Sequence, residues 1–284
     1  MMTGSCRCSD LLPSVLVAII LTAFIPQQAH CRQSVWDLPH ENEVISAGSV
    51  TIGSSFVRDT YLSASRYDGL LIGLENDRWK GLLEDGVFST GRSHASLMFS
   101  SLTNRNDGGR TLELTGTAYK AWLWHAVDCN KCDLLVGPAC MIDIDILYNM
   151  QNTNNPINAE GYLAAGLCVD NTFRYNVRNY PMALQATLYI PLAGIGIAPD
   201  YDQPYWLMYR YGEYGKALHF ISPFNNPALS QQIALVLPVL DSRLRIGYTF
   251  DFMRNSLGGH STYVLNGTFS IGYAVRFQTK RWGR

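Results

Sequence analysis

The sequence predicts an all-β protein, an antiparallel transmembrane β-barrel of about 10–12 strands preceded by a signal peptide. Three observations support this class. Apolar and polar residues alternate with a period of two along most of the chain, as in strands with two different faces. The polar face carries mainly Gly, Ser, Thr and Asn, whereas an exposed soluble sheet carries dense Lys and Glu. Beyond the leader, no apolar run reaches the ~18 residues of a spanning helix.

The first 31 residues have the layout of a secretory signal peptide. Arg7 supplies a positive start, Leu11–Ile25 forms an apolar centre, and the polar stretch Pro26–Cys31 follows. This centre is shorter than the ~20 residues of a transmembrane helix, so we expect cleavage near Cys31. A retained anchor and a lipoprotein acylated at Cys31 are the alternatives, and His30 is a poor residue to precede a lipidated cysteine.

Three further segments are expected after residues 1–31. Residues 32–69 are interpreted as a periplasmic lead-in or partial plug, because no clear alternation precedes Leu70. Residues 70–277 form the barrel, and residues 278–284 form a short basic tail. Phe277 closes the last alternating run, and bacterial outer-membrane barrels commonly end on such an aromatic strand. If that strand ends in the periplasm, Leu240–Arg243 is a tight periplasmic turn and Arg254–Ser261 an outer loop.

The C-terminal run shows the two faces most clearly. Tyr263, Leu265, Phe269, Ile271 and Tyr273 share one parity, and the opposite parity is small and polar. The other candidate strands are Leu70–Trp79, Ser89–Leu102, Thr111–His125, Cys140–Tyr148, Tyr162–Tyr175, Met182–Ile190, Tyr205–Phe220, Ser230–Leu240 and Leu244–Phe252. The charged residues expected to face the lumen are Asp143, Asp145, Arg174, Arg245, Asp251 and Arg276.

A soluble periplasmic β-sandwich that binds a ligand would also alternate, with its apolar face inward. Aromatic residues at strand ends favour the membrane barrel, because interfacial girdles form there. These residues are Tyr148, Tyr175, Tyr263 and Phe277.

Short segments of the chain resemble an uncharacterised family of Bacteroidetes cell-envelope proteins predicted to form outer-membrane β-barrels. The segments are Asp59–Ser63, Tyr67–Gly69, Tyr211–Gly215 and Ser222-Pro223, together with the leader. The resemblance implies an outer-membrane location and a barrel fold over nearly the whole mature chain. It implies no activity and no catalytic residue.

Charge and cysteine content limit the remaining function classes. The formal charge of −1 gives no broad field for polyanions, so nucleic acid is not an expected partner. Cys129-Asn-Lys-Cys132 is a single C-x-x-C, which is weak as a zinc or redox motif, so we expect either a loop-closing disulfide or free thiols. No cofactor and no metal site is predicted.

His94-Ala95-Ser96 is the one candidate for catalysis. A two-residue spacing on a strand places imidazole and hydroxyl on one face, where a base can activate a nucleophile. Barrel phospholipases and lipid A deacylases use this spacing, but their following Asn is replaced here by Leu97. Leu97 and Phe99 take the lipid-facing parity, so His94 and Ser96 are expected in the lumen, as a polar pair rather than as a lipase site.

The other polar candidates have structural interpretations. Asp143 and Asp145 share a face and suit acid–base chemistry or calcium, but we expect them to pair with lumen arginines such as Arg174, Arg245 or Arg276. His260 follows two glycines in a loop and needs no special role.

The expected function is therefore that of a narrow channel or an envelope-structural barrel. A lipid-modifying hydrolase and a soluble ligand-binding sandwich are the alternatives. The expected partners are outer-membrane lipids and the barrel-assembly machinery, and any small-molecule ligand is unknown.

Overall fold

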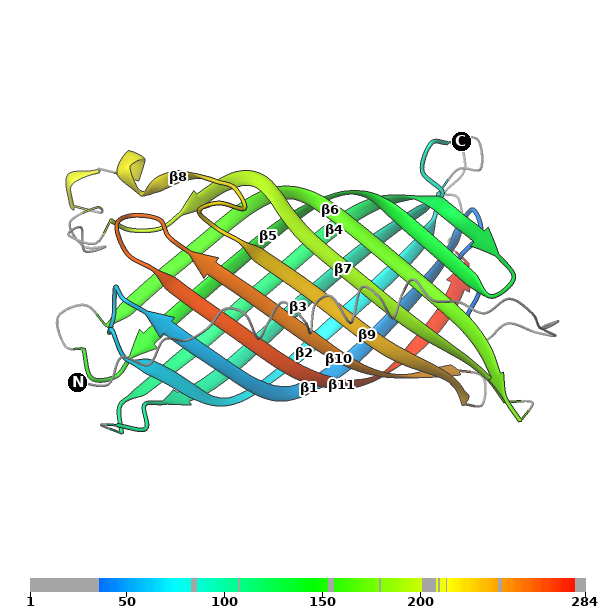
Figure 1. Cartoon of the computed structure of the whole chain (residues 1–284), viewed down its shortest axis with the longest axis horizontal. Coiled ribbons are helices and arrows are strands. Elements are labelled where there is room, and N and C mark those ends of the chain that lie inside the picture. Colours follow the sequence, from blue (N-terminus) through cyan, green and yellow to red (C-terminus); the bar gives the residue numbers. More distant parts are fainter. Residues whose placement is uncertain are drawn as a thin grey trace.

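The computed structural model describes residues 36–82, 86–106, 108–152, 156–178, 180–200, 208, 210–212, 214–239 and 242–278. The predicted signal peptide and residues 279–284 of the predicted tail lie outside the described residues. Ten long strands form the barrel wall (Figure 1). They are β1 (Glu43–Asp59), β2 (Arg66–Gly81), β3 (Thr90–Thr103), β4 (Arg110–Cys129), β5 (Cys132–Asn149), β6 (Ile157–Val177), β7 (Tyr180–Ile197), β9 (Ala228–Val239), β10 (Ser242–Asn255) and β11 (Thr262–Gln278).

The sheet closes on itself. Its order runs β6-β5-β4-β3-β2-β1-β11-β10-β9-β7, and β7 also pairs with β6. Every neighbouring pair among these strands is antiparallel. Closure leaves no strand edge in the wall, so backbone N–H and C=O groups find partners without water. The predicted antiparallel barrel is confirmed, and its ten strands fall within the predicted range.

The two ends of the barrel differ. At the terminal end, where Glu43 and Gln278 pair, two residues join β4 to β5, β6 to β7 and β9 to β10, and eight residues join β2 to β3. At the loop end every connection has six residues or more, and that between β7 and β9 holds the 3-10 helix η2 (Tyr214–Ala217) and the short strand β8 (Leu218–Ile221). Figure 1 shows η2 and β8 at the left, loop end of the tilted strands. The predicted turn near Leu240–Arg243 and loop Arg254–Ser261 lie at these opposite ends, as expected.

The wall has an apolar outer face and a polar inner face. In β5, Ile142, Ile144 and Ile146 are exposed, whereas the alternate residues Asp143 and Asp145 are buried in the lumen. Each of the ten strands exposes at least one large apolar side chain. Examples from successive strands of the sequence are Val50, Ile72, Phe99, Leu114, Ile144, Leu163, Leu184, Ile233, Ile246 and Ile271. The sequence pattern predicted these faces because side chains alternate strictly across a strand.

The N-terminal boundary of the predicted barrel is wrong. Glu43–Asp59 is not a lead-in; it is β1, paired with β11 along its full length and with β2. Its outward positions include Gly48 and Ser54 beside Val50 and Ile52, so its alternation of apolar residues is weak. β1 therefore has only a weak alternation of apolar and polar residues, and its pairing with β11 and β2 holds it in the sheet.

The predicted strand Tyr205–Phe220 is also wrong. Within its described part, η2 occupies Tyr214–Ala217, and only Leu218–Ile221 is extended, as β8. β8 pairs with Gly194–Ile197 at the end of β7, outside the ring of ten strands. No helix among the described residues is long and apolar enough to cross a membrane.

We predict that a charge on the outer face costs stability according to its depth. Ile142→Arg lies near the middle of β5 and should lower the free energy of unfolding in lipid by about 2–4 kcal/mol. Met150→Arg, just after the end of β5 and similarly exposed, should cost about 0–1 kcal/mol. Urea titration of both variants in lipid vesicles measures the difference, and equal costs would contradict a lipid-facing wall.

Candidate functional site: the lumen of the barrel

The lumen is filled at its terminal end by the segment before β1. Trp36 is fully buried and packs edge-to-face on Trp79, with 5.0 Å between ring centroids. Arg174 Nε donates to the Trp36 carbonyl oxygen at 2.6 Å, and Arg276 donates to the Asp37 carbonyl oxygen. Residues 36–41 are thus tied into the mouth of the barrel. Between this segment and the wall lies a cavity of about 570 Å³, lined by charged and polar side chains that include Asp37, His125 and Asp133.

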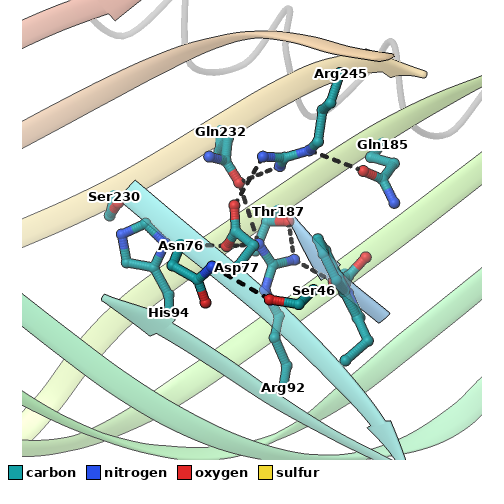
Figure 2. Close-up of polar contacts among 12 residues, drawn as sticks. Ser46, Asn76, Asp77, Arg92, His94, Gln185, Thr187, Ser230, Gln232 and Arg245 are labelled. Carbon is teal, nitrogen blue, oxygen red and sulfur yellow. Dashed lines mark hydrogen bonds and ion pairs between the residues drawn. The ribbon is translucent and has the colours of Figure 1, made fainter. Parts of the chain in front are cut away.

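A network of buried charges crosses the lumen next to Trp79. We call it the ion-pair belt and define it by Asp77, Arg92, Asp170 and Arg245. Asp77 accepts from Arg92 Nη2 at 3.0 Å and from Arg245 Nη1 at 2.8 Å (Figure 2). Arg92 also pairs with Asp170, which accepts from Trp79 Nε1 at 3.0 Å. The belt joins the neighbouring strands β2 and β3 to β6 and to β10, which lie three steps away from them on either side around the ring.

Amides and aromatic faces complete the belt. Gln232 Oε1 accepts from both arginines, at 3.1 Å from Arg92 and 2.7 Å from Arg245. Gln185 Oε1 accepts from Arg245 Nε at 3.1 Å. Arg92 lies over the Trp79 ring, 4.8 Å from its centroid. Two guanidinium groups face two carboxylates with these partners, so the charges of the belt balance although the side chains have at most 1% exposure.

Such a buried network is costly to break. Removing water from each charge costs several kcal/mol, which the pairing and the extra hydrogen bonds offset only while every partner is present. The belt and the packed Trp36 thus place fully buried side chains across the lumen at this level.

The predicted pair His94 and Ser96 lines a cavity beside the belt, on its loop-end side. The cavity is about 70 Å³ and is also lined by Asp143, Asp145 and Asp251. His94 Nδ1 lies 3.0 Å from Asp77 Oδ1, and its ring stacks on Tyr119. Both predicted residues therefore face the lumen, as expected.

The contacts of this cavity do not support hydrolysis of lipid. Among the hydrogen bonds of the described residues, none joins His94 to Ser96. The volume holds about five water molecules at ~15 Å³ each, far below the volume of an acyl chain. We interpret His94 as a partner of Asp77 that extends the belt toward this cavity.

The predicted pairs between lumen acids and arginines are wrong. Asp143 accepts from Thr117 at 2.5 Å and Asp145 from Thr115 at 3.2 Å. Asp251 accepts from Ser230 at 2.6 Å. The arginines lie nearer the terminal end. Their acidic partners are Asp133 for Arg174, Asp77 for Arg245 and Glu43 for Arg276.

The acids instead line the loop-end half of the lumen. Glu113 belongs to the same group and accepts from Ser55 at 2.8 Å and from Ser100. Small hydroxyl side chains thus solvate these carboxyl groups in place of arginines, and all of them except Ser55 lie on the neighbouring strand.

A second cluster of ionisable groups lies at the loop end and is defined by Asp59, Glu160 and His260; we call it the rim cluster. His260 Nε2 lies 3.0 Å from Glu160 Oε1. All three side chains are buried. Burial lowers the pKa of His260, but the hydrogen bond and charge of Glu160, helped by Asp59, outweigh it and raise that pKa above its usual value.

The rim cluster was missed because its residues carry no motif. His260 follows Gly258 and Gly259, which have φ values of 58° and 74°. That left-handed turn brings the imidazole into a buried position, whereas the sequence predicts a loop residue with no special role. Asp59 lies in the segment that the sequence predicts to be a lead-in, and Glu160 lies just before the predicted strand Tyr162–Tyr175. The two glycines were the only local signal of an unusual backbone.

The four cysteines among the described residues are free thiols. Cys129 and Cys140 are exposed, and Cys132 and Cys168 are buried. Cys129 Sγ donates to the Cys132 carbonyl oxygen across the two-residue turn between β4 and β5. Of the two expectations, the structure shows free thiols.

The closed wall, its apolar outer face and its polar filled lumen define a β-barrel with the architecture of outer-membrane proteins. The chain belongs to the family described as "Protein of unknown function (DUF3316)", whose model matches residues 15–281. No curated protein matches the sequence.

A solved outer-membrane barrel shares the fold. The outer membrane protease OmpT from Escherichia coli is 8% identical over 86% of this chain and 100% of its own, with a TM-score of 0.50. The translocator domain of the autotransporter NalP from Neisseria meningitidis is 8% identical, covering 93% and 95%, with a TM-score of 0.35. At these identities the likeness concerns the fold alone.

We predict that the belt contributes more to stability than an exposed pair of the same chemistry. Asp77→Asn leaves both arginines short of a counter-charge and should lower the free energy of unfolding by about 3–5 kcal/mol. Asp68→Asn removes the exposed pair between Asp68 and Arg105 and should cost about 0–1 kcal/mol. Urea unfolding in lipid vesicles reports both. A small loss for Asp77→Asn would show that the belt is not a structural element.

Proposed function

We propose that the protein resides in the Gram-negative outer membrane as a barrel with a shut lumen that serves the cell envelope structurally. The observation that carries this proposal is the ion-pair belt, which fills the cross-section together with Trp36. The apolar outer face on all ten strands supports contact with outer-membrane lipids. A cleaved signal peptide over residues 1–31, insertion by the barrel-assembly machinery and an origin in the Bacteroidetes belong to the same proposal.

The aromatic residues support the same placement. Tyr148 is exposed near the loop end of β5, and Tyr180, Trp124 and Phe277 are exposed near the terminal end. Amphipathic rings favour the boundaries between acyl chains and water. The strands are 12 to 21 residues long, which exceeds the ~9–11 residues needed to cross the bilayer. The wall can therefore span a membrane and project beyond it.

A narrow channel for cations is the second candidate. The loop-end half of the lumen carries Glu113, Asp143, Asp145 and Asp251, and acidic linings favour cations. Conduction would require the belt to open and residues 36–41 to leave the mouth. The lipid hydrolase has weaker support, since His94 and Ser96 face a small cavity and not the bilayer.

The test combines location with conductance. The full chain expressed in a Gram-negative host should sediment with outer membranes and show heat-modifiable gel mobility. Inserted into planar bilayers, it should give no steady ohmic conductance in 1 M KCl. Asp77→Ala/Arg245→Ala removes one charge of each sign and keeps the pair of Arg92 with Asp170. With Trp36→Ala added, this variant should conduct, because three of the side chains that cross the lumen at this level are shortened.

Asp68→Ala, an exposed change at the start of β2, is the matched control and should remain closed. Steady conductance of the unmodified chain would favour the channel. Recovery of a soluble periplasmic monomer would contradict both membrane functions.

A further inference from the structure

The rim cluster brings three metal-ligand atoms to one point of the lumen. One donor atom each from Asp59, Glu160 and His260 lies within 4.8 Å of the other two. The distance of 3.0 Å between His260 Nε2 and Glu160 Oε1 is close to that between two ligands of one ion. Bonds of about 2.0–2.1 Å at a tetrahedral angle place two ligands about 3.3 Å apart.

Neighbouring residues hold the two carboxylates in place by donating hydrogen bonds to them. Asn158 Nδ2 donates to Asp59 Oδ2 and to Glu160 Oε1, both at 2.8 Å. Thr262 Oγ1 donates to Glu160 Oε1 at 2.8 Å, and the Tyr61 backbone N–H donates to Asp59 Oδ1 at 2.8 Å. Metal sites use such outer partners to orient their ligands.

His260 is oriented so that its Nε2 can bind an ion while its Nδ1 faces a backbone carbonyl group. His260 Nδ1 lies 3.5 Å from the Gly258 carbonyl oxygen. A proton on Nδ1 directed at this carbonyl leaves the lone pair of Nε2 free for an ion, which is the usual state of a ligating imidazole. The side chain of Tyr61 packs against the same ring, with 5.3 Å between centroids.

Asn255 adds an independent sign of a missing ligand. It is 5% exposed, and its Nδ2 donates to Glu160 Oε2 at 2.6 Å. Its Oδ1 is buried and has no hydrogen-bond partner among the described residues. A buried amide oxygen without a hydrogen-bond partner is unfavourable. This oxygen belongs to Asn255, whose Nδ2 already contacts Glu160 of the rim cluster. A turn of the amide would offer Oδ1 as a further ligand.

The charges of the rim cluster also favour a bound cation. One imidazolium cannot neutralise two buried carboxylates, and no arginine or lysine contacts Asp59 or Glu160 among the described ion pairs. A divalent ion would balance both.

We propose that Asp59, Glu160 and His260 form a binding site for a divalent transition-metal ion of the zinc type. Imidazole together with carboxylate suits zinc, whereas calcium takes oxygen ligands and a larger coordination number. Binding displaces the proton shared between Nε2 and Oε1 to solvent. The ion would link β1 to β6, which lie five steps apart in either direction around the ten-stranded ring, and would fix the β10–β11 loop.

The test uses the full chain refolded in detergent, in a Cys129→Ser/Cys132→Ser background that removes the thiols at the other end. After removal of metals with a chelator, calorimetric titration with ZnCl2 should show one saturable site per chain. Co2+ in place of Zn2+ should give visible bands typical of nitrogen and oxygen ligands. Zn2+ should raise the unfolding temperature, and CaCl2 should not.

His260→Gln and Asp59→Asn should each weaken Zn2+ binding at least tenfold, and Asn158→Ala should weaken it by about 10–100-fold through lost orientation of the ligands. His219→Gln, at an outer-loop histidine in β8, is the matched control and should bind as the parent does. Heat-modifiable mobility checks that each variant is folded. The absence of saturable binding by the parent, equal binding by folded His260→Gln, or equal binding of Ca2+ would overturn the proposal.

Discussion

The pairing of Asp77 with Arg92 and Arg245 is the interaction on which the structure of the lumen depends. One fully buried carboxylate receives two guanidinium groups and His94, from strands on different sides of the barrel. Breaking a buried ion pair leaves an uncompensated charge and is strongly destabilising, so the strands that carry the belt are held in one register and at one separation. The closed cross-section follows from this constraint, because any opening would separate charges in a medium that solvates them poorly.

The belt also divides the lumen chemically. Toward the terminal end, arginines meet aspartates and the N-terminal segment, and the charge is balanced. Toward the loop end, Glu113, Asp143, Asp145 and Asp251 have hydroxyl partners, and the rim cluster adds two more carboxylates with a single histidine. The charges therefore balance at the terminal end, whereas carboxyl groups are in excess at the loop end. This excess makes the loop-end half of the lumen suited to a cation. The proposed metal site is the point where buried carboxylates meet an imidazole.

The sequence predicts the wall and the facing of its side chains better than it predicts contacts across the lumen. Alternation over Ile142–Ile146 and over the C-terminal run assigned inward and outward residues correctly, because the pleat alone decides them. β1 was missed, since Gly48 and Ser54 dilute its pattern. Contacts between opposite strands depend on how the sheet closes and how its strands are staggered. The sequence of a single strand does not contain this information. Arg245 and Asp77 are 168 residues apart, and nothing local links them.

The coupling between Asp77 and Arg245 tests the central claim most directly. A double-mutant cycle of Asp77→Ala, Arg245→Ala and the double variant, measured by urea unfolding in lipid vesicles, isolates the energy of the pair. The account predicts that the double variant is more stable than the sum of the single losses implies. The coupling energy should be near the upper end of the ~0.5–3 kcal/mol found for contacting residues. Additive losses would show that the two charges do not hold the barrel shut.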